Sequence, residues 1–172
     1  MRLVAIVGTK KSGKTTVVER MLGELARRDL VAGSLKFIHH DGFTIHAEGR
    51  DTARHWGAGA QFSIALAPGE TTMVRRTQGS HDSLADVEGL VPTGTDVMLC
   101  EGLITGGPDV RTVLCLRDGG QAATYLRELP EDASPVAVSG LVAATEDAVS
   151  DLPALDVTDE GDLARLVDLV LA

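Results

Sequence analysis

The sequence predicts an α/β fold: a mostly parallel β-sheet flanked by helices, with an antiparallel β-hairpin as an addition. Three observations indicate this fold class. Short apolar runs rich in β-branched residues, such as residues 3–7, are typical of strands buried on both faces of a parallel sheet. Segments with apolar residues at helical spacing alternate with these runs, as in βα units. Two further strand-like runs flank Pro68-Gly69, a sequence typical of a tight turn between hairpin strands.

The first strand, 3–7, is followed by an amphipathic helix that begins near Thr15. Apolar pairs recur there every four residues, from Val17 to Ala26, with charged residues between them. The same kinds of pattern predict strands at 31–38, 97–100, 112–116, 136–139 and 155–157. They also predict helices at 51–56 and 83–91 and hairpin strands at 61–67 and 70–76. A last amphipathic helix begins near Asp159, where acidic residues favour a helix N-terminus.

The length and charge of the chain limit its organisation and its partners. At 172 residues we expect one domain over 1–172. Sixteen basic and 25 acidic residues give a net charge of -9, which disfavours binding to nucleic acid or to an anionic membrane. Only four residues are lysines, and Lys10, Lys11 and Lys14 lie within five positions of each other. This local positive charge indicates a small polyanion, such as a nucleotide.

The remaining composition predicts a reduced, cytoplasmic protein. No apolar run approaches the roughly 18 residues that a membrane span needs, and the first residues lack the features of a signal peptide. Cys100 and Cys115 both lie in runs that we expect to be buried strands, which makes a disulfide framework unexpected.

A phosphate-binding loop follows the first strand. Residues 8–15, Gly-Thr-Lys-Lys-Ser-Gly-Lys-Thr, match GxxxxGK[ST] between a predicted strand and a predicted helix, which is the setting this motif requires. Its glycines let successive N–H groups face phosphate oxygens, and the helix N-terminus adds positive potential. The residues that we expect to bind the nucleotide are Gly8, Thr9, Lys10, Lys11, Ser12, Gly13, Lys14, Thr15 and Thr16. The fold is therefore expected to be P-loop NTPase-like.

Three residues are expected to act on the phosphates and the metal ion. Lys14 is placed to contact the β- and γ-phosphates, and the Thr15 hydroxyl is placed to bind Mg²⁺. Glu101 ends a predicted buried strand, at the sheet edge where α/β proteins bind ligands. It is expected to hold a Mg²⁺-bound water or to orient an attacking one, so Lys14 and Glu101 are the predicted catalytic residues.

Four of the five histidines lie between residues 39 and 55. Lys36, His39 and His40 follow the second predicted strand, so this segment should emerge beside the phosphate loop. Transition-metal binding is one interpretation of the cluster. A role in a loop near the Mg²⁺-nucleotide is the other.

These elements in combination resemble the MobB family, molybdopterin-guanine dinucleotide biosynthesis protein B. The resemblance lies in the GxxxSGKTT loop at 8–16, the Lys-x-x-His-His-Asp segment at 36–41, Gly-Arg-Asp-Thr at 49–52 with Ala-Gly-Ala at 58–60, and the strand end at 99–102. Arg117-Asp118-Gly119, the total length and the C-terminal helix also fit, so the resemblance covers nearly the whole chain.

The resemblance implies a GTP-binding protein with weak GTPase activity. Such a protein would assist a separate molybdopterin guanylyltransferase (MobA-like), with molybdopterin or molybdoenzymes as further partners. Asp41 or Asp51 would complete the metal site of Thr15 and Glu101. Relatives form homodimers through β-ribbons, for which the hairpin at 61–76 is the candidate here. The chain contains no Asn-Lys-x-Asp guanine-recognition motif, so the choice of GTP over ATP depends on the resemblance alone.

Two alternatives belong to other functional classes. The histidine cluster beside a phosphate loop is also compatible with a GTPase that delivers nickel or another metal to an enzyme, although the segment contains no cysteine. A small-molecule kinase would need a lid and a second substrate pocket. The chain has few residues to spare for a lid and no arginine cluster of the kind that closes over ATP.

Overall fold

The structure is a computed structural model of the 172-residue chain, and it describes residues 1–38, 51–77 and 88–172. These form two compact units. The first comprises Met1–Phe37 and Asp82–Ala172, and the second comprises Ile38–His81. We describe each unit by itself.

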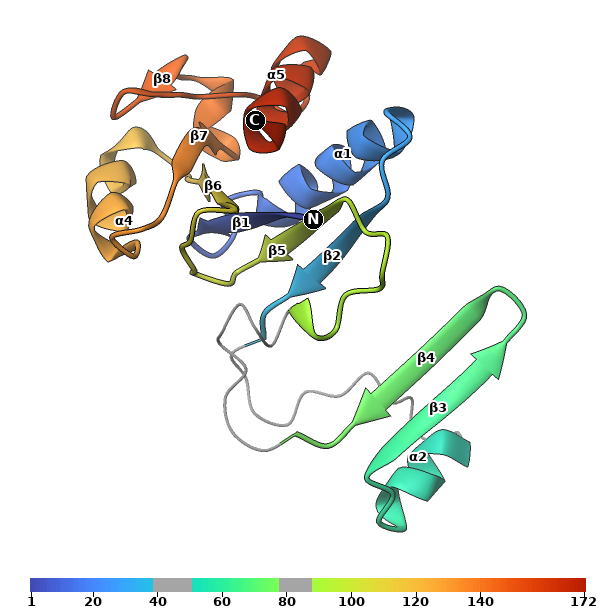
Figure 1. Ribbon diagram of the computed structural model, residues 1–172. Helices are drawn as coiled ribbons and strands as arrows, with labels where there is room; N and C mark the ends of the chain where they lie inside the picture. Colours follow the sequence, from blue (N-terminus) through green and yellow to red (C-terminus); the bar gives the residue numbers. More distant parts are fainter. Residues whose placement is uncertain (39–50, 78–87) are drawn as a thin grey trace. The chain divides into compact units, whose positions relative to one another are not determined.

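The first unit is built on a five-stranded parallel sheet with the order β2-β5-β1-β6-β7 (Figure 1). Its strands are β1 (Arg2–Gly8), β2 (Ala32–Lys36), β5 (Val97–Glu101), β6 (Val110–Cys115) and β7 (Pro135–Ser139). The helices that the structure describes in full in this unit are α1 (Lys14–Arg27), the 3₁₀ turn η1 (Gly119–Gln121), α4 (Ala122–Glu128), the 3₁₀ turn η2 (Leu141–Ala144) and α5 (Glu160–Leu171). A short ribbon pairs β8 (Ala148–Val149) with β9 (Leu152–Pro153). The predicted α/β class with a mostly parallel sheet is confirmed.

Both faces of this sheet are covered, which explains the continuous apolar runs in the sequence. Alternate residues of a strand point to opposite faces. Val4 and Ile6 pack with α1 and α5 on one face, whereas Leu3, Ala5 and Val7 belong to a second core cluster that includes residues of α4 and η2. Figure 1 shows α1 and α5 side by side, in agreement with their packing contacts. Burying β1 on both faces fixes the position of the loop that follows it.

The helix boundaries follow from identifiable caps. Gly13, at φ 95°, precedes α1, and its carbonyl accepts a 3.0 Å bond from Val17 N. Asp159 caps α5: its carboxylate accepts bonds from Gly161 N and Asp162 N at 2.8 and 2.9 Å, which satisfies two of the helix's free donors. The final helix predicted from about Asp159 is thereby confirmed.

The second unit contains the predicted hairpin and a short helix. α2 (Asp51–Gly57) precedes the antiparallel pair β3 (Phe62–Ala67) and β4 (Glu70–Arg75), which turns at Gly69 with φ 84°. Arg76 ties the hairpin to α2. Its guanidinium lies 4.1 Å from the centroid of the Trp56 ring, and Nη2 donates to the Trp56 carbonyl at 2.8 Å.

Some predicted elements differ from the structure. The strand predicted at 155–157 is wrong. Leu155 donates to the Val138 carbonyl at 2.9 Å, but the segment passes β7 with only one isolated bridge, at Ala154, before turning into α5. The strand predicted at 31–38 is shorter, because β2 is a half-exposed edge strand. The helix predicted at 83–91 lies largely outside the described residues, which resume at the helical Glu88.

Both cysteines are buried and free. Burial raises the pKa of the Cys100 thiol to about 11 and that of the Cys115 thiol to about 12, which keeps both neutral at physiological pH. Among the described residues, no helix has the length and apolar character needed to cross a membrane.

Candidate functional site

The loop after β1 has the backbone of a phosphate-binding loop. Gly8 and Gly13 adopt φ values of 146° and 95°, and Lys11 adopts 62°. The loop thus uses positive backbone φ angles, which residues with a side chain rarely adopt. A Cβ atom at Gly8 would lie 1.9 Å from the Cys115 carbonyl oxygen on β6. The first glycine of the motif is therefore required by packing between strands as well as by its conformation.

Lys14 holds this loop from within. Its ammonium Nζ donates to the Thr9 carbonyl at 2.6 Å and to the Gly8 carbonyl at 3.1 Å. The contacts place a positive charge over the loop at the N-terminus of α1, where the helix dipole also favours an anion. Phosphate is the ligand chemistry to which this arrangement is suited.

Thr15, Glu101 and Lys36 meet beside the loop. The Thr15 hydroxyl donates to the Glu101 carboxylate, at 3.2 Å from Oε1 and 3.3 Å from Oε2. Parallel pairing of β2 with β5 places Lys36 next to Glu101, and Lys36 Nζ lies 3.0 Å from Oε1. The Glu101 side chain is 12% exposed, against 60% for Lys36. The largely buried Glu101 carboxylate is thus already paired with a cation.

The donor set fits Mg²⁺. A hydroxyl and a carboxylate are hard oxygen ligands, and two protein ligands of this kind, together with phosphate oxygens, are typical of magnesium in nucleotide sites. Thr15 and Glu101 lie within hydrogen-bonding distance of each other, close enough to serve one ion. Among the described residues, no group of three or more His, Cys, Asp or Glu side chains could hold a metal by themselves. Thr15 and Glu101 are thus two described residues that could hold a magnesium ion together with phosphate oxygens.

The structure brings only part of the predicted site together. The predicted nucleotide-binding residues from Gly8 to Thr16 form one continuous loop and first helical turn, on which Lys10, Lys11, Thr15 and Thr16 are exposed. His39, His40 and Asp41 lie outside the described residues. Asp51 belongs to the second unit, where it pairs with Arg54 at 3.6 Å. Its role as a metal ligand stays a prediction.

Two contacts of the loop were missed by the sequence reasoning. Gly140, directly after β7 with φ 83°, lies against the loop: a Cβ there would be 2.1 Å from the Ser12 carbonyl oxygen, and Leu141 N donates to that oxygen at 3.2 Å. Thr9 Oγ1 contacts Gln121 Oε1 at 3.5 Å. The Gly140 contact could have been anticipated from a glycine that directly follows a predicted strand. Nothing in the sequence indicates the contact between Thr9 and Gln121.

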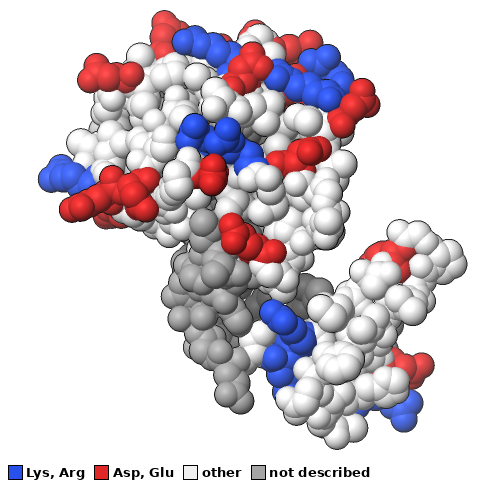
Figure 2. Space-filling view, viewed as in Figure 1, with Lys and Arg blue, Asp and Glu red and all other residues white. Residues whose placement is uncertain are grey.

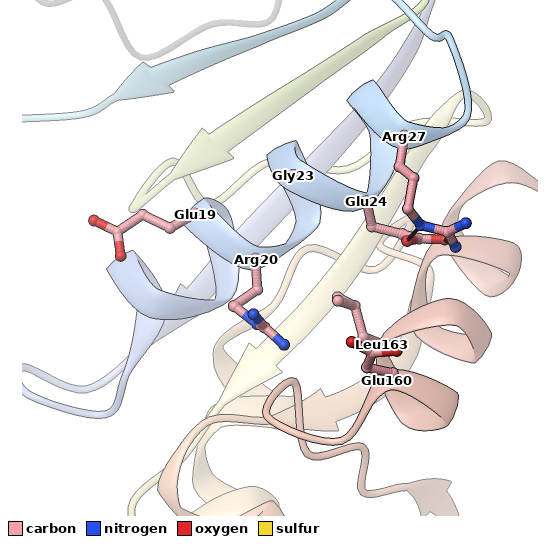
Figure 3. A pocket seen from close by; sticks show the side chains of 7 residues that line it. All are labelled: Glu19, Arg20, Gly23, Glu24, Arg27, Glu160 and Leu163. Carbon is pink, nitrogen blue, oxygen red and sulfur yellow. Dashed lines mark hydrogen bonds and ion pairs between the residues drawn. The ribbon is translucent and has the colours of Figure 1, made fainter.

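A separate surface pocket lies between α1 and α5 (Figure 3). It is lined by Glu19, Arg20, Gly23, Glu24, Arg27, Glu160 and Leu163. Glu24 is almost fully buried and pairs with Arg27 at 2.8 Å and with Arg28 at 2.7 Å. Hydrogen bonds from Arg27 and then Arg28 hold the pKa of the Glu24 carboxyl below its ordinary value. None of the residues that line this pocket belongs to the phosphate loop.

Comparison with known proteins identifies the family. The family model described as "Molybdopterin guanine dinucleotide synthesis protein B" matches residues 3–128. A "Probable molybdopterin-guanine dinucleotide biosynthesis adapter protein" of Bacillus subtilis (strain 168) is 32% identical over 101 residues, which are 58% of this chain. The match spans only 57% of the length of that relative.

Solved structures support the same assignment at the level of the fold. The crystal structure of Bacillus subtilis MobB superposes with a TM-score of 0.73 at 24% identity, covering 98% of both chains. A MobB homologue from Bacillus stearothermophilus gives 0.70 at 23% identity, covering 99% of this chain and 98% of that one. With the family model spanning well over half of the sequence, this chain belongs to the MobB family.

Proposed function

We propose that this protein binds GTP with Mg²⁺ at the phosphate loop. The backbone N–H groups of the loop and the Lys14 ammonium would bind the β- and γ-phosphates, with Lys14 exchanging its carbonyl partners for phosphate oxygens. Thr15 and Glu101 would hold the magnesium ion, which neutralises part of the phosphate charge when bound. The single observation that carries the proposal is the convergence of Lys14, Thr15 and Glu101 on one sheet edge in a MobB-family chain.

Weak GTPase activity is consistent with the same residues. Glu101 can accept a proton or orient a water molecule at the γ-phosphate, and Lys14 can stabilise charge that develops on the phosphate oxygens. Slow GTP hydrolysis suits a protein that acts through being GTP-bound and not through the GDP and phosphate that it releases.

The role that this site would serve is that of an adapter. We propose that the GTP-bound protein assists a molybdopterin guanylyltransferase in attaching GMP to molybdopterin. The family description and the adapter name of the Bacillus subtilis relative support this role.

The test is a pull-down with the purified chain as bait. Native extract is offered to the protein loaded with Mg²⁺ and a non-hydrolysable GTP analogue, and separately to the nucleotide-free protein. We expect the loaded protein to retain a molybdopterin guanylyltransferase or a molybdoenzyme. Retention of urease or hydrogenase maturation proteins in its place would contradict the proposal and favour metal delivery.

We further propose that residues 1–172 act as one P-loop domain whose hairpin forms a homodimer. One hairpin face carries Phe62, Ile64 and Leu66, which are 61%, 49% and 80% exposed, with Met73 opposite Ile64. Figure 2 shows much of the hairpin surface without charge. A two-stranded ribbon with an exposed apolar face is marginal in water, and a second copy of the same face would cover it.

A charge on that face should separate the dimer. We expect Leu66→Lys to weaken self-association at least about tenfold, because it would bury an unpaired ammonium in the interface. Sedimentation equilibrium over a range of protein concentrations measures the effect.

The control places the same charge on the neighbouring residue of the opposite face. Ala65 is exposed and lies across from Thr72, so Ala65→Lys should leave the dimer intact. Equal dissociation constants for the wild type and Leu66→Lys would exclude this face as the interface.

A further inference from the structure

The carboxyl ends of β6 and β7 lie on the side of the phosphate loop away from Glu101. The sheet order places β5, with Glu101, on one side of β1 and places β6 and β7 on the other. With strands about 4.8 Å apart, β5 and β7 are separated by roughly 14 Å. If the γ-phosphate and Mg²⁺ lie at Thr15 and Glu101, as the proposed function requires, the nucleoside end of the ligand points toward β6 and β7.

The segments after β6 and β7 are fixed to the loop by main-chain bonds. Leu141 N donates to the Ser12 carbonyl at 3.2 Å, and Val142 N donates to the Leu116 carbonyl at 3.2 Å. We call the backbone segments that follow β6 and β7 the β6–β7 wall. Because its hydrogen bonds join backbone to backbone, the position of this wall does not depend on side-chain rotamers. The Leu141 side chain is 56% exposed although its own backbone is tied to the phosphate loop. It offers an apolar surface against which a purine ring can pack.

Glu146 is an acidic residue whose side chain is held against this wall by a main-chain hydrogen bond. The exposed Glu146 carboxylate, which follows η2, accepts a hydrogen bond from Gly119 N at 3.2 Å through Oε1. It lies so close to η1 that a Cβ atom on Gly119 would be 2.6 Å from Oε2. Among the described residues, this bond is the only one that the carboxylate makes. One oxygen is therefore held by the main chain, and acceptor capacity remains for a ligand.

We propose that Glu146 recognises the guanine base, in a chain that lacks the Asn-Lys-x-Asp motif. This inference rests on the proposed function and specifies its base. Guanine presents two donors side by side, N1–H and the exocyclic N2–H, which match a carboxylate acceptor. Adenine presents an unprotonated N1 at the corresponding position, which a carboxylate repels. Glu146 thus selects guanine, and Leu141 packs against either purine.

The test compares four nucleotides on one pair of proteins. Dissociation constants of GTP, ATP, ITP and XTP are measured by calorimetry with Mg²⁺ for the wild type and Glu146→Gln. The wild type should prefer GTP over ATP and over ITP, which lacks the exocyclic amine. Glu146→Gln should lose about 10- to 100-fold in GTP affinity with ATP affinity unchanged. It should gain affinity for XTP, because the glutamine amide can donate to the carbonyl that replaces the guanine amine.

Three further variants separate the contributions. Gly119→Ala, which displaces the carboxylate without changing its chemistry, should also reduce the preference for GTP. Leu141→Ala should weaken GTP and ATP equally. Asp147→Asn removes the adjacent exposed carboxylate and should change nothing.

Two outcomes overturn the inference while the proposed function stands. One is an unchanged GTP preference in Glu146→Gln. The other is loss of that preference in Asp118→Asn alone, which would assign recognition to the neighbouring loop. A wild type that binds none of the four nucleotides would instead overturn the proposed function itself.

Discussion

Replacing Lys14 with alanine is expected to reduce GTP affinity at least about 100-fold. The variant loses the ammonium that bonds to the Thr9 and Gly8 carbonyls, which is the charge positioned to exchange onto the phosphates. Hydrogen bonds to charged groups contribute about 1.5–3 kcal/mol each, and two such contacts account for a loss of this size. Titration calorimetry of the wild type and Lys14→Ala with Mg²⁺-GTP measures it.

Lys10→Ala is the matched control, because it removes the same charge from the same loop. Lys10 is exposed, and no hydrogen bond from its side chain to a described residue is present. We expect only a loss of a few-fold, from the weaker long-range attraction. Equal losses in the two variants would mean that general positive charge, and not the position of Lys14, binds the nucleotide. Circular dichroism should give matching spectra for both.

The second large effect is expected for Gly8→Ala. The new methyl group would meet the Cys115 carbonyl oxygen at 1.9 Å, and Gly8 pairs with Cys115 in the parallel register of β1 and β6. The φ of 146° adds backbone strain for any residue with a Cβ. We expect the free energy of unfolding to fall by about 3–5 kcal/mol, as measured by urea denaturation.

Gly23→Ala is the opposite case within the neighbouring helix. A Cβ at Gly23 meets nothing within 4 Å, and the residue lies inside α1. Alanine should therefore stabilise the protein by about 0.5–1 kcal/mol, through helix propensity and a less flexible unfolded chain. Unfolding midpoints that move in the same direction for both variants would contradict the packing argument at Gly8.

The sequence predicted the sheet well because its strands are buried on both faces. β1 and β5 are short apolar runs with no competing helical period, and α1 and α5 carry clear apolar stripes. The phosphate loop was predictable because its function requires particular residue types at fixed spacing. Glu101 was found from one topological rule, since carboxyl ends of parallel strands share an edge.

Other features depend on tertiary contacts that local patterns do not encode. The run at 155–157 alternates apolar and polar residues as a strand does, but Leu155 and Val157 fill the core that α5 covers without extended pairing along β7. The helix α4 is only seven residues long, and a helix this short gives the apolar pattern few repeats. Gly140 and Gln121 contact the loop across more than 100 residues of chain, and only the folded sheet brings them there.

The close approach of Gly8 to Cys115 and of Gly140 to Ser12 has a consequence for protein engineering. Both contacts involve main-chain atoms, so the backbone path, and not the side chains, sets the shape of the phosphate loop. An exposed residue such as Lys10 can then be replaced, to tune nucleotide affinity or to attach a reporter group, without changing the shape of the phosphate loop. Gly8 and Gly140, by contrast, should be kept fixed in any mutant library, because a Cβ atom at either position would clash with a backbone oxygen.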